Sequence, residues 1–210
     1  MIAALAAGLS ALELDADETA RARLSQYIEL LEKWNRTHNL TAIRDPAQMV
    51  THHLLDSLAT LSHLPQRASL RVLDIGSGGG LPGIPLAIAR QGWHVVLLDS
   101  NHKKAAFLRQ AVIELGLANA QVSDARAQDY DADPLFDIVI SRAFSDLATF
   151  AALGRRLVAP EGRLVAMKGL YPHEELEQLA PDVVISDVPA VRVPGLDVQR
   201  HLVIMEPRAA

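Results

Sequence analysis

A glycine-rich segment around residue 76 holds the residue types most suited to chemistry in this 210-residue chain. An apolar run leads into an acid and then into glycines at every second position, in the register Asp74-x-Gly76-x-Gly78-x-Gly80. A second apolar run ends at Asp99. Strand, glycine turn, helix, strand and terminal acid are typical of a unit that binds a nucleoside. The glycines let the backbone approach the ligand, and the carboxylate of Asp99 accepts hydrogen bonds from the ribose hydroxyls.

Two nucleoside cofactors fit this pattern, a dinucleotide such as NAD and S-adenosylmethionine. The glycines from residue 78 to 83 also satisfy the dinucleotide fingerprint G-x-G-x-x-G. A dinucleotide rests its pyrophosphate on backbone N–H groups at the start of the following helix, but Pro82 and Pro85 each remove such a donor. S-adenosylmethionine has no phosphate, and its cationic amino acid end suits a carboxylate such as Asp74. We therefore expect S-adenosylmethionine as the cofactor, with NAD as the alternative.

The composition allows one large domain, or a core domain with an appended piece, and excludes several protein classes. Half of the residues are hydrophobic, but no run of eighteen apolar residues is present to span a membrane. The chain has no cysteine, which removes disulfides and thiolate metal sites. The net charge of −5 means that an RNA substrate would require positive residues focused on one face. The first nine residues lack the basic start of a signal peptide, and we expect a cytoplasmic protein.

Helical periodicity dominates the N-terminal part of the chain. Apolar positions from Leu24 to Trp34 follow helical spacing, and a polar break is expected at Asn35–Thr41. A second helix is predicted to begin with Asp45 as its cap and Pro46 in the first position. Five apolar residues of that helix are expected to be buried: Met49, Val50, Leu54, Leu58 and Leu61.

Beyond a short linker at 65–69, apolar strands alternate with helical segments, of which Asn101–Leu115 is the clearest. This alternation predicts an α/β protein with a parallel sheet, right-handed crossovers and helices on both faces. No helical period separates the last two strands, so we expect them to pair as an antiparallel hairpin. Ligands in such sheets bind at the carboxyl ends of the strands. The expected strands are Arg71–Ile75, His94–Asp99, Gln121–Asp124, Phe136–Ser141, Arg163–Met167, Val183–Val188 and His201–Met205.

If the chain transfers a methyl group, two sequence signatures that it lacks limit which chemical group can accept it. Methylation of a pyrimidine at C5 commonly uses a cysteine nucleophile, and the chain has none. Methylation of an exocyclic amine often relies on an Asn- or Asp-Pro-Pro-aromatic motif after the fourth strand, where this chain has Ser141-Arg142-Ala143-Phe144. What remains is an acceptor that is already nucleophilic, such as purine N7, or an oxygen acceptor with a base elsewhere. Transfer to N7 requires alignment rather than a general base.

Six groups of residues form a specific set when they are taken together and in order. The first two are Tyr27-x-x-Leu30-Leu31-x-x-Trp34-Asn35-x-x-x-Asn39-Leu40-Thr41 and His53-x-Leu55-Asp56-Ser57-Leu58. The others are Asp74-Ile75-Gly76-Ser77-Gly78-Gly79-Gly80-Leu81-Pro82-Gly83-Ile84-Pro85, Leu98-Asp99-Ser100 with Lys103-Lys104, Ser141-Arg142-Ala143-Phe144, and Lys168-Gly169. With this set the chain resembles the bacterial small-subunit ribosomal RNA methyltransferase G family, also called glucose-inhibited division protein B. The resemblance extends from about residue 24 to residue 207.

The resemblance implies a Rossmann-like class I S-adenosylmethionine-dependent methyltransferase with a mostly parallel seven-stranded sheet. It implies an N-terminal helical extension over residues 1–65, packed on a methyltransferase domain over residues 66–210. The implied reaction moves a methyl group from S-adenosylmethionine to N7 of one guanine in 16S ribosomal RNA, near the decoding region. The implied partner is 16S ribosomal RNA or the small ribosomal subunit, with no membrane and no metal, and we expect a monomer.

By position, the resemblance places Gly76 and Leu81 against the donor, the backbone at Ala127–Gln128 on the adenine, and Arg142 beside the methyl group. The family usually has glutamate where Gln128 stands, a change that a backbone contact tolerates. The expected cofactor-binding residues are Asp74, Gly76, Gly78, Leu81, Asp99, Ala127, Gln128 and Arg142. The expected catalytic residues are Arg142 and Lys168, and the expected contacts to RNA are Arg36, Asn39, Lys103 and Lys104.

Two of these residues also have a purely structural alternative. Asp74 could cap the turn without contacting a ligand, and Arg142 could pair with a carboxylate such as Asp146. Two other functional classes also stay open: a small-molecule methyltransferase whose N-terminal helices close an apolar pocket, and a sensor that binds the nucleoside without transfer. An RNA-modifying enzyme would gather Arg44 and Arg109 with other cations at the mouth of the site, and its binding would weaken with added salt.

Overall fold

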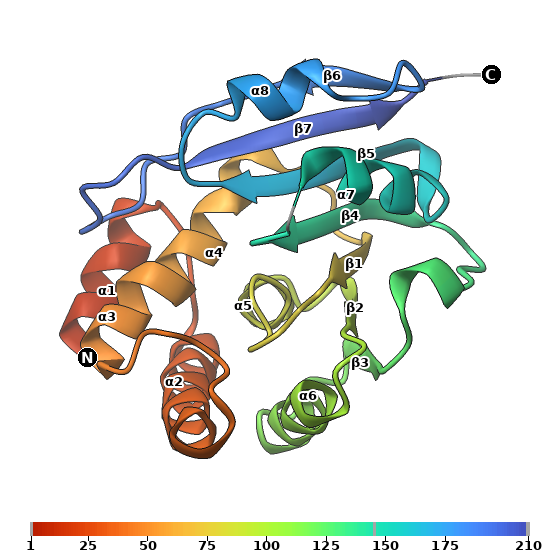
Figure 1. Cartoon of the computed structure of the whole chain (residues 1–210). Helices are drawn as coiled ribbons and strands as arrows, with labels where there is room; N and C mark the ends of the chain where they lie inside the picture. The colour runs from red at the N-terminus through yellow and green to blue at the C-terminus, as the bar shows by residue number, and fades with distance from the viewer. Residues whose placement is uncertain (1, 145, 209–210) are drawn as a thin grey trace.

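The computed structural model describes residues 2–144 and 146–208. At its centre lies a seven-stranded sheet in the order β3-β2-β1-β4-β5-β7-β6, with helices on both faces (Figure 1). Strand β7 runs antiparallel to both of its neighbours, and the other neighbouring strands are parallel. The mostly parallel sheet and the terminal antiparallel hairpin are therefore confirmed. The strands are β1 (Arg71–Ile75), β2 (His94–Leu98), β3 (Ala120–Ser123), β4 (Phe136–Arg142), β5 (Val158–Lys168), β6 (Val183–Asp187) and β7 (His201–Pro207).

The N-terminal part of the chain is helical, as predicted. It comprises α1 (Ile2–Ala11), α2 (Glu18–His38), and one continuous stretch made of α3 (Pro46–Met49), a π-helical segment (Val50–Leu55), α4 (Asp56–Leu58) and a 3₁₀ turn (Ala59–His63). The side chain of Asp45 accepts a hydrogen bond from the backbone N–H of Ala47 at 3.0 Å and caps this stretch. The five apolar residues expected to be buried there are each at most 1 % exposed.

The polar break predicted at Asn35–Thr41 is wrong at its start, because α2 continues to His38. Asn35 is buried inside the helix, and its side chain bonds to the loop that follows. Its Oδ1 accepts from the backbone N–H of Thr41 at 2.9 Å, and its Nδ2 donates to the carbonyl of Ile43 at 3.1 Å. Asn35 thus satisfies backbone groups of the loop, whereas the helix ends at His38, where the following residue, Asn39, has a left-handed φ of +50°.

The remaining helices are divided between the two faces of the sheet. Helix α5 (Gly83–Ala89) and α6 (His102–Glu114) lie on the same face as the N-terminal helices, and α7 (Leu147–Arg155) covers the other face (Figure 1). A short helix, α8 (His173–Glu177), follows β5. Successive residues of β1 point to opposite faces, so Val72 belongs to one hydrophobic cluster and Leu73 to the other.

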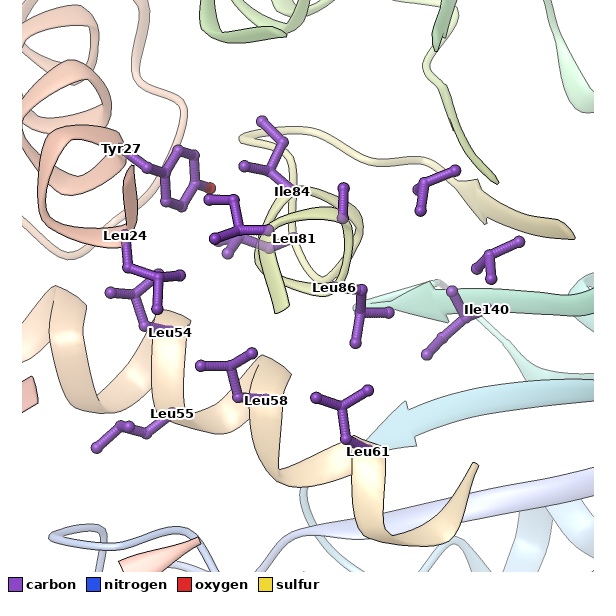
Figure 2. Close-up of a cluster of buried hydrophobic side chains, with 14 of the residues drawn as sticks. Leu24, Tyr27, Leu54, Leu55, Leu58, Leu61, Leu81, Ile84, Leu86 and Ile140 are labelled. Atoms are coloured by element: carbon purple, nitrogen blue, oxygen red, sulfur yellow. The ribbon is translucent and has the colours of Figure 1, made fainter. Parts of the chain in front are cut away.

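The N-terminal helices share one hydrophobic core with the sheet. In Figure 2, Leu24 and Tyr27 of α2 and three leucines of the 46–63 stretch, Leu54, Leu58 and Leu61, face the α5 region and Ile140 of β4. Tyr27 is fully buried in this cluster. Because the cluster is continuous, the N-terminal helices hold fixed positions relative to the carboxyl ends of the strands.

Leu58→Ala is expected to lower the free energy of unfolding by about 2–5 kcal/mol, because the truncation leaves a cavity in this core. Leu58 is 1 % exposed. Ile113→Ala serves as the control, since Ile113 is 74 % exposed on α6 and should contribute less than about 0.5 kcal/mol. Urea unfolding followed by circular dichroism measures both values. Equal losses in the two variants would contradict the packing of the N-terminal helices on the sheet.

Candidate functional site

The loop between β1 and α5 requires glycine at alternate positions. Gly76, Gly78 and Gly80 have φ angles of +71°, +57° and +87°, and other residues enter this left-handed region at a cost of about 1–2 kcal/mol. A Cβ atom added to Gly76 would meet no atom within 4 Å, so the backbone there has an open side. The hydroxyl of Tyr27 donates to the carbonyl of Gly79, which ties the loop to α2. The loop is therefore a fixed turn that a ligand can approach closely.

A pocket of about 260 Å³ opens beside this loop, at the carboxyl ends of β1 and β2. It brings together four of the predicted cofactor-binding residues: Gly76, Asp99, Ala127 and Gln128. Ala127 and Gln128 begin a 3₁₀ turn, Ala127–Asp129, that follows β3. The rest of the wall is formed by Ile75, Leu98, Ser100, Ala125, Arg126, Phe144 and Leu153.

The carboxylate of Asp99 is held in one orientation at the edge of this pocket. Its Oδ2 accepts from the backbone N–H of Gly78 at 2.8 Å, and its Oδ1 accepts from that of Asn101 at 2.9 Å. Each carboxylate oxygen can accept a further hydrogen bond. Asp99 therefore retains the capacity to bind two hydroxyl donors, the number that a ribose presents.

Asp74 lies beneath the glycine loop rather than in the pocket wall. It is fully buried, its Oδ2 accepts from the backbone N–H of Gly83 at 2.9 Å, and its Oδ1 has no hydrogen-bond partner among the described residues. Burial raises the pKa of Asp74 to about 7, against the opposing effect of the Gly83 hydrogen bond. This geometry favours bracing of the loop, and a direct contact with the donor stays a prediction. Leu81 is likewise packed in the core and is not part of the pocket wall.

Asp74→Asn is expected to gain stability relative to the wild type as the pH rises. The folded-state pKa of about 7 lies above the unfolded value near 3.9, so between these values the native state binds a proton that the unfolded state does not. Wild-type stability should therefore fall, relative to the variant, by up to about 1.4 kcal/mol per pH unit from about pH 4 to pH 7, and stay constant above. Denaturant unfolding of both proteins across this range measures the difference. A difference that does not change with pH would contradict the raised pKa.

A second pocket, of about 320 Å³, lies at the carboxyl ends of β4 and β5. It contains both predicted catalytic residues, Arg142 at the end of β4 and Lys168 at the end of β5. Ala143 has a φ of +59°, a strained conformation for a residue other than glycine, and the next residue, Phe144, lines the first pocket. The two pockets therefore flank the same turn. The other residues that line the second pocket are Asp56, Met167, Gly169 and Arg200.

Arg142 is held by groups from the N-terminal helices. Its Nη1 donates to the carbonyl of His52 at 3.0 Å and lies 3.3 Å from Oδ2 of Asp56. Asp56 is 4 % exposed, and its Oδ1 accepts from Nε of Arg200 at 2.8 Å. Two guanidinium groups around one buried carboxylate leave a net positive charge in the pocket. The carboxylate that pairs with Arg142 thus comes from a helix distant in sequence.

Lys168 is paired with a carboxylate of α8. Its Nζ lies 2.6 Å from Oε2 of Glu175, and the lysine side chain is 13 % exposed. The same oxygen accepts from the backbone N–H of Leu147 at 2.8 Å. Because the charge of Lys168 is neutralised by this ion pair, Arg142 and Arg200 supply more of the positive charge in the pocket.

His53 is a buried, hydrogen-bonded residue of the 46–63 stretch. Burial, together with the nearby charge of Arg142, lowers its pKa to about 4. Its Nε2 lies 2.8 Å from Oγ1 of Thr41. At neutral pH His53 is therefore uncharged, and it links the loop after α2 to the surroundings of Arg142.

Two of the residues predicted to contact RNA lie at the end of α2, outside both pockets. Arg36 is exposed and pairs with Glu32 at 2.6 Å. Asn39 follows the helix, and its Oδ1 accepts from Arg44 at 3.4 Å. These residues form a polar rim whose contact with RNA stays a prediction.

The other two predicted RNA contacts, Lys103 and Lys104, occupy the first turn of α6. Their backbone N–H groups donate to Oδ1 of Asn101, which caps the helix. Arg109 of the same helix pairs with Asp124 at 2.8 Å, and its hydrogen bond and charge hold the pKa of that carboxyl below its usual value. Arg109 is therefore engaged with Asp124, whereas Lys103 and Lys104 line neither pocket and form no ion pair within the described residues.

Sequence reasoning missed Asp56 and Arg200 as site residues. A carboxylate in a leucine-rich helix is a detectable signal, because a buried acid needs a cationic partner. Nothing near Arg200 in the sequence signals its role, since it lies 144 positions from Asp56. The site therefore depends on contacts between segments that are far apart in the chain.

The comparison with known sequences agrees over nearly the whole chain. The family model for rRNA small subunit methyltransferase G matches residues 20–203. The ribosomal RNA small subunit methyltransferase G of Chromobacterium violaceum is 53% identical over 203 residues, covering 97% of this chain and 96% of that protein. The protein of the same name from Nitrosospira multiformis is 51% identical over 209 residues, covering 96% and 95%.

Solved structures resemble the chain at lower identity. A mutant of MtNAS in complex with S-adenosylmethionine has a TM-score of 0.60 at 16% identity and covers 90% of this chain and 76% of that one. Ribosomal protein L11 methylase from Lactobacillus delbrueckii subsp. bulgaricus has a TM-score of 0.56 at 14% identity, with coverages of 74% and 77%. These likenesses concern the fold alone, and they confirm the predicted Rossmann-like class I methyltransferase fold.

Proposed function

Because this chain belongs to the rRNA small subunit methyltransferase G family, we propose that it transfers a methyl group from S-adenosylmethionine to N7 of one guanine in 16S ribosomal RNA, near the decoding region. The observation that carries the proposal is the pair of pockets on either side of the turn at 143–144. We call the pocket beside Gly76 and Asp99 the donor pocket. The pocket beside Arg142 and Lys168 is the acceptor pocket.

The donor pocket fits S-adenosylmethionine better than NAD. The start of α5 has few free N–H groups for a pyrophosphate, because Pro82 and Pro85 have none. The N–H of Gly83 is already bonded to Asp74, and that of Ile84 to the carbonyl of Gly80. A ligand without phosphate needs none of these donors. In the proposal, Asp99 binds the ribose hydroxyls, and the backbone at 127–128 contacts the adenine.

The acceptor pocket is suited to alignment of an RNA rather than to proton removal. When bound, S-adenosylmethionine supplies a methyl group on a positively charged sulfur. Guanine N7 carries a lone pair and no proton, so positioning provides most of the rate. In the lining of this pocket, Asp56 is held between two arginines and Lys168 is paired with Glu175. In this proposal Arg142 binds a phosphate group of the RNA backbone, because guanidinium groups bind phosphates in a bidentate manner.

The ends of α2 and α6 form the rest of the RNA surface in this proposal. The ring of Trp34 contacts that of Phe107 at 5.6 Å between centroids, so the end of α2 lies near the start of α6. We assign four residues of these two helix ends to RNA contact and call them the polar rim: Arg36, Asn39, Lys103 and Lys104.

We further propose an N-terminal helical extension at 1–65 and a methyltransferase domain at 66–210. The extension supplies Tyr27 to the glycine loop and Asp56 to the acceptor pocket. The enzyme acts as a monomer in the cytoplasm on free 16S ribosomal RNA or the small subunit. Within the described residues, no helix has the length and apolar character needed to cross a bilayer. In the same part of the chain, no group of three or more His, Cys, Asp or Glu side chains is arranged to hold a metal ion.

The proposal is tested on ribosomal RNA from a strain that lacks this gene. Mass mapping should show the loss of one N7-methylguanosine in 16S ribosomal RNA, and the wild-type gene should restore it. Purified protein with methyl-labelled donor should modify RNA from the deletion strain and leave already modified RNA unlabelled. Unchanged RNA together with labelling of a small molecule would instead support the small-molecule methyltransferase. Donor binding without any transfer would support the sensor.

A further inference from the structure

Three aromatic side chains meet just beyond the acceptor pocket. The ring of Tyr171 lies 4.4 Å from that of His173 and 5.5 Å from that of His201, measured between centroids. The contact with His201 is edge-on, at an interplanar angle of 83°. Tyr171 is nevertheless 39 % exposed, whereas the other tyrosine, phenylalanine and tryptophan side chains are buried or half-buried. It is therefore a ring that its neighbours hold in place and that still presents surface to solvent.

The chain attaches this cluster directly to the acceptor pocket. Lys168 is opposite His201 in the β5–β7 ladder, and Nδ1 of His201 lies 3.0 Å from the carbonyl oxygen of Gly169. Gly169 lines the acceptor pocket, and so does Arg200, which immediately precedes His201. Tyr171 follows Gly169 by two positions. The tyrosine ring thus lies next to a pocket in which two arginines share the carboxylate of Asp56 and leave a net positive charge.

The strand order places Tyr171 on the side of the acceptor pocket that faces away from the donor pocket. The donor pocket lies at the ends of β1 and β2, and the acceptor pocket at the ends of β4 and β5. Tyr171 follows β5 and contacts the first residue of β7, the next strand in the sheet. Along this edge the order is donor, acceptor, aromatic ring. A base that reaches Tyr171 is therefore a neighbour of the methylated guanine rather than that guanine itself.

We propose that Tyr171 is a stacking platform for a base that flanks the target guanine in the RNA. The inference rests on the proposed function, because it takes RNA as the substrate. Single-stranded RNA is bound by stacking unpaired bases on aromatic rings while cationic side chains hold the phosphates. Tyr171 supplies the ring, and Arg142 and Arg200 supply the cations. Because His173 and His201 already fix the ring, little side-chain freedom is lost when a base stacks on it.

The test compares Tyr171→Leu, which removes the ring, with Tyr171→Phe and Tyr171→Trp, which keep a stacking face. The substrates are small subunits and 16S ribosomal RNA from the deletion strain. Tyr171→Leu should raise the KM for RNA by roughly tenfold to hundredfold. Its Kd for S-adenosylmethionine should not change, because Tyr171 is not in the donor pocket. Tyr171→Phe and Tyr171→Trp should stay within about threefold of the wild-type KM, since both retain an aromatic face.

A second readout reports stacking itself. With 2-aminopurine in place of a base next to the target guanine, fluorescence should be quenched by the wild type and Tyr171→Phe, and not by Tyr171→Leu. A wild-type KM for Tyr171→Leu would overturn the platform, and so would equal losses in all three variants, because a purely structural role would not depend on aromaticity. These outcomes differ from failure of the proposed function, in which the wild type itself would methylate no RNA.

Discussion

Arg142→Ala is expected to lower the kcat for ribosomal RNA methylation by about a hundredfold, because without this guanidinium the RNA is no longer held with guanine N7 aligned on the methyl group. Arg142 ends β4 in the acceptor pocket, with Asp56 and the His52 carbonyl as its partners. It is not in the wall of the donor pocket. The Kd for S-adenosylmethionine should therefore stay within about twofold of the wild type, and isothermal calorimetry with single-turnover kinetics measures the two values separately.

The salt dependence of RNA binding gives an independent measure of the same residue. If Arg142 contacts a phosphate, the slope of log Kd against log salt should decrease by about one in Arg142→Ala. Arg142→Lys keeps the charge but lacks the planar fork that bonds to two partners at once. It should retain the salt slope while losing part of kcat, because the charge stays and the orientation does not.

Arg163→Ala is the matched control for charge. Arg163 lies on β5, the strand next to that of Arg142, and pairs with Glu206 at 3.6 Å, but it lines neither pocket. Its removal should leave kcat unchanged. If Arg142→Ala weakened donor binding as strongly as turnover, the assignment of Arg142 to the RNA would be wrong. Its role would then be that of a cofactor contact.

Local sequence signals were sufficient to predict that the glycine loop and Asp99 meet at one edge of the sheet. The segment from β1 through the glycine loop to β2 and Asp99 is continuous in the chain. Its turn has positive φ angles that favour glycine, so the glycines in the sequence mark the turn directly. Helix α6 was predictable from its helical periodicity and from Gly116, which follows it. The terminal hairpin was predictable because no helical period separates the last two strands. Gly76 and Asp99 line one pocket together with Ala127 and Gln128, which the family resemblance alone had indicated, and the contact of these residues with the donor stays a prediction.

The acceptor side could not be predicted in the same way, because it depends on tertiary contacts. Asp56 reaches Arg142 across 86 positions and Arg200 across 144. Asn35 looked like a helix break, yet its amide serves the following loop from inside α2. Strand β5 begins at Val158, before the predicted Arg163, with a register shift opposite β4 that accommodates its turn-like residues. In each case packing between distant segments overrides the local preference.

Gly76→Ala is expected to weaken binding of S-adenosylmethionine by roughly tenfold to hundredfold, because the new methyl group overpacks the ligand site at about 1–3 kcal/mol. The protein itself has room for this methyl group, since a Cβ at Gly76 meets no atom within 4 Å. The remaining cost to the fold is the positive φ of +71°, about 1–2 kcal/mol. Calorimetric titration with S-adenosylmethionine measures the loss of affinity, and urea unfolding measures the loss of stability.

Gly116→Ala separates these two effects. Gly116 has a similar φ of +60°, and its added Cβ would come no closer than 3.7 Å to any atom, namely the Arg23 guanidinium. It follows α6 and is not part of the donor pocket. Both variants should therefore lose similar stability, and only Gly76→Ala should lose affinity for the donor. If the two variants bound S-adenosylmethionine equally well, the donor would not lie against the open side of Gly76. The proposed alignment of the methyl group and the guanine across the 143–144 turn would then be wrong as well.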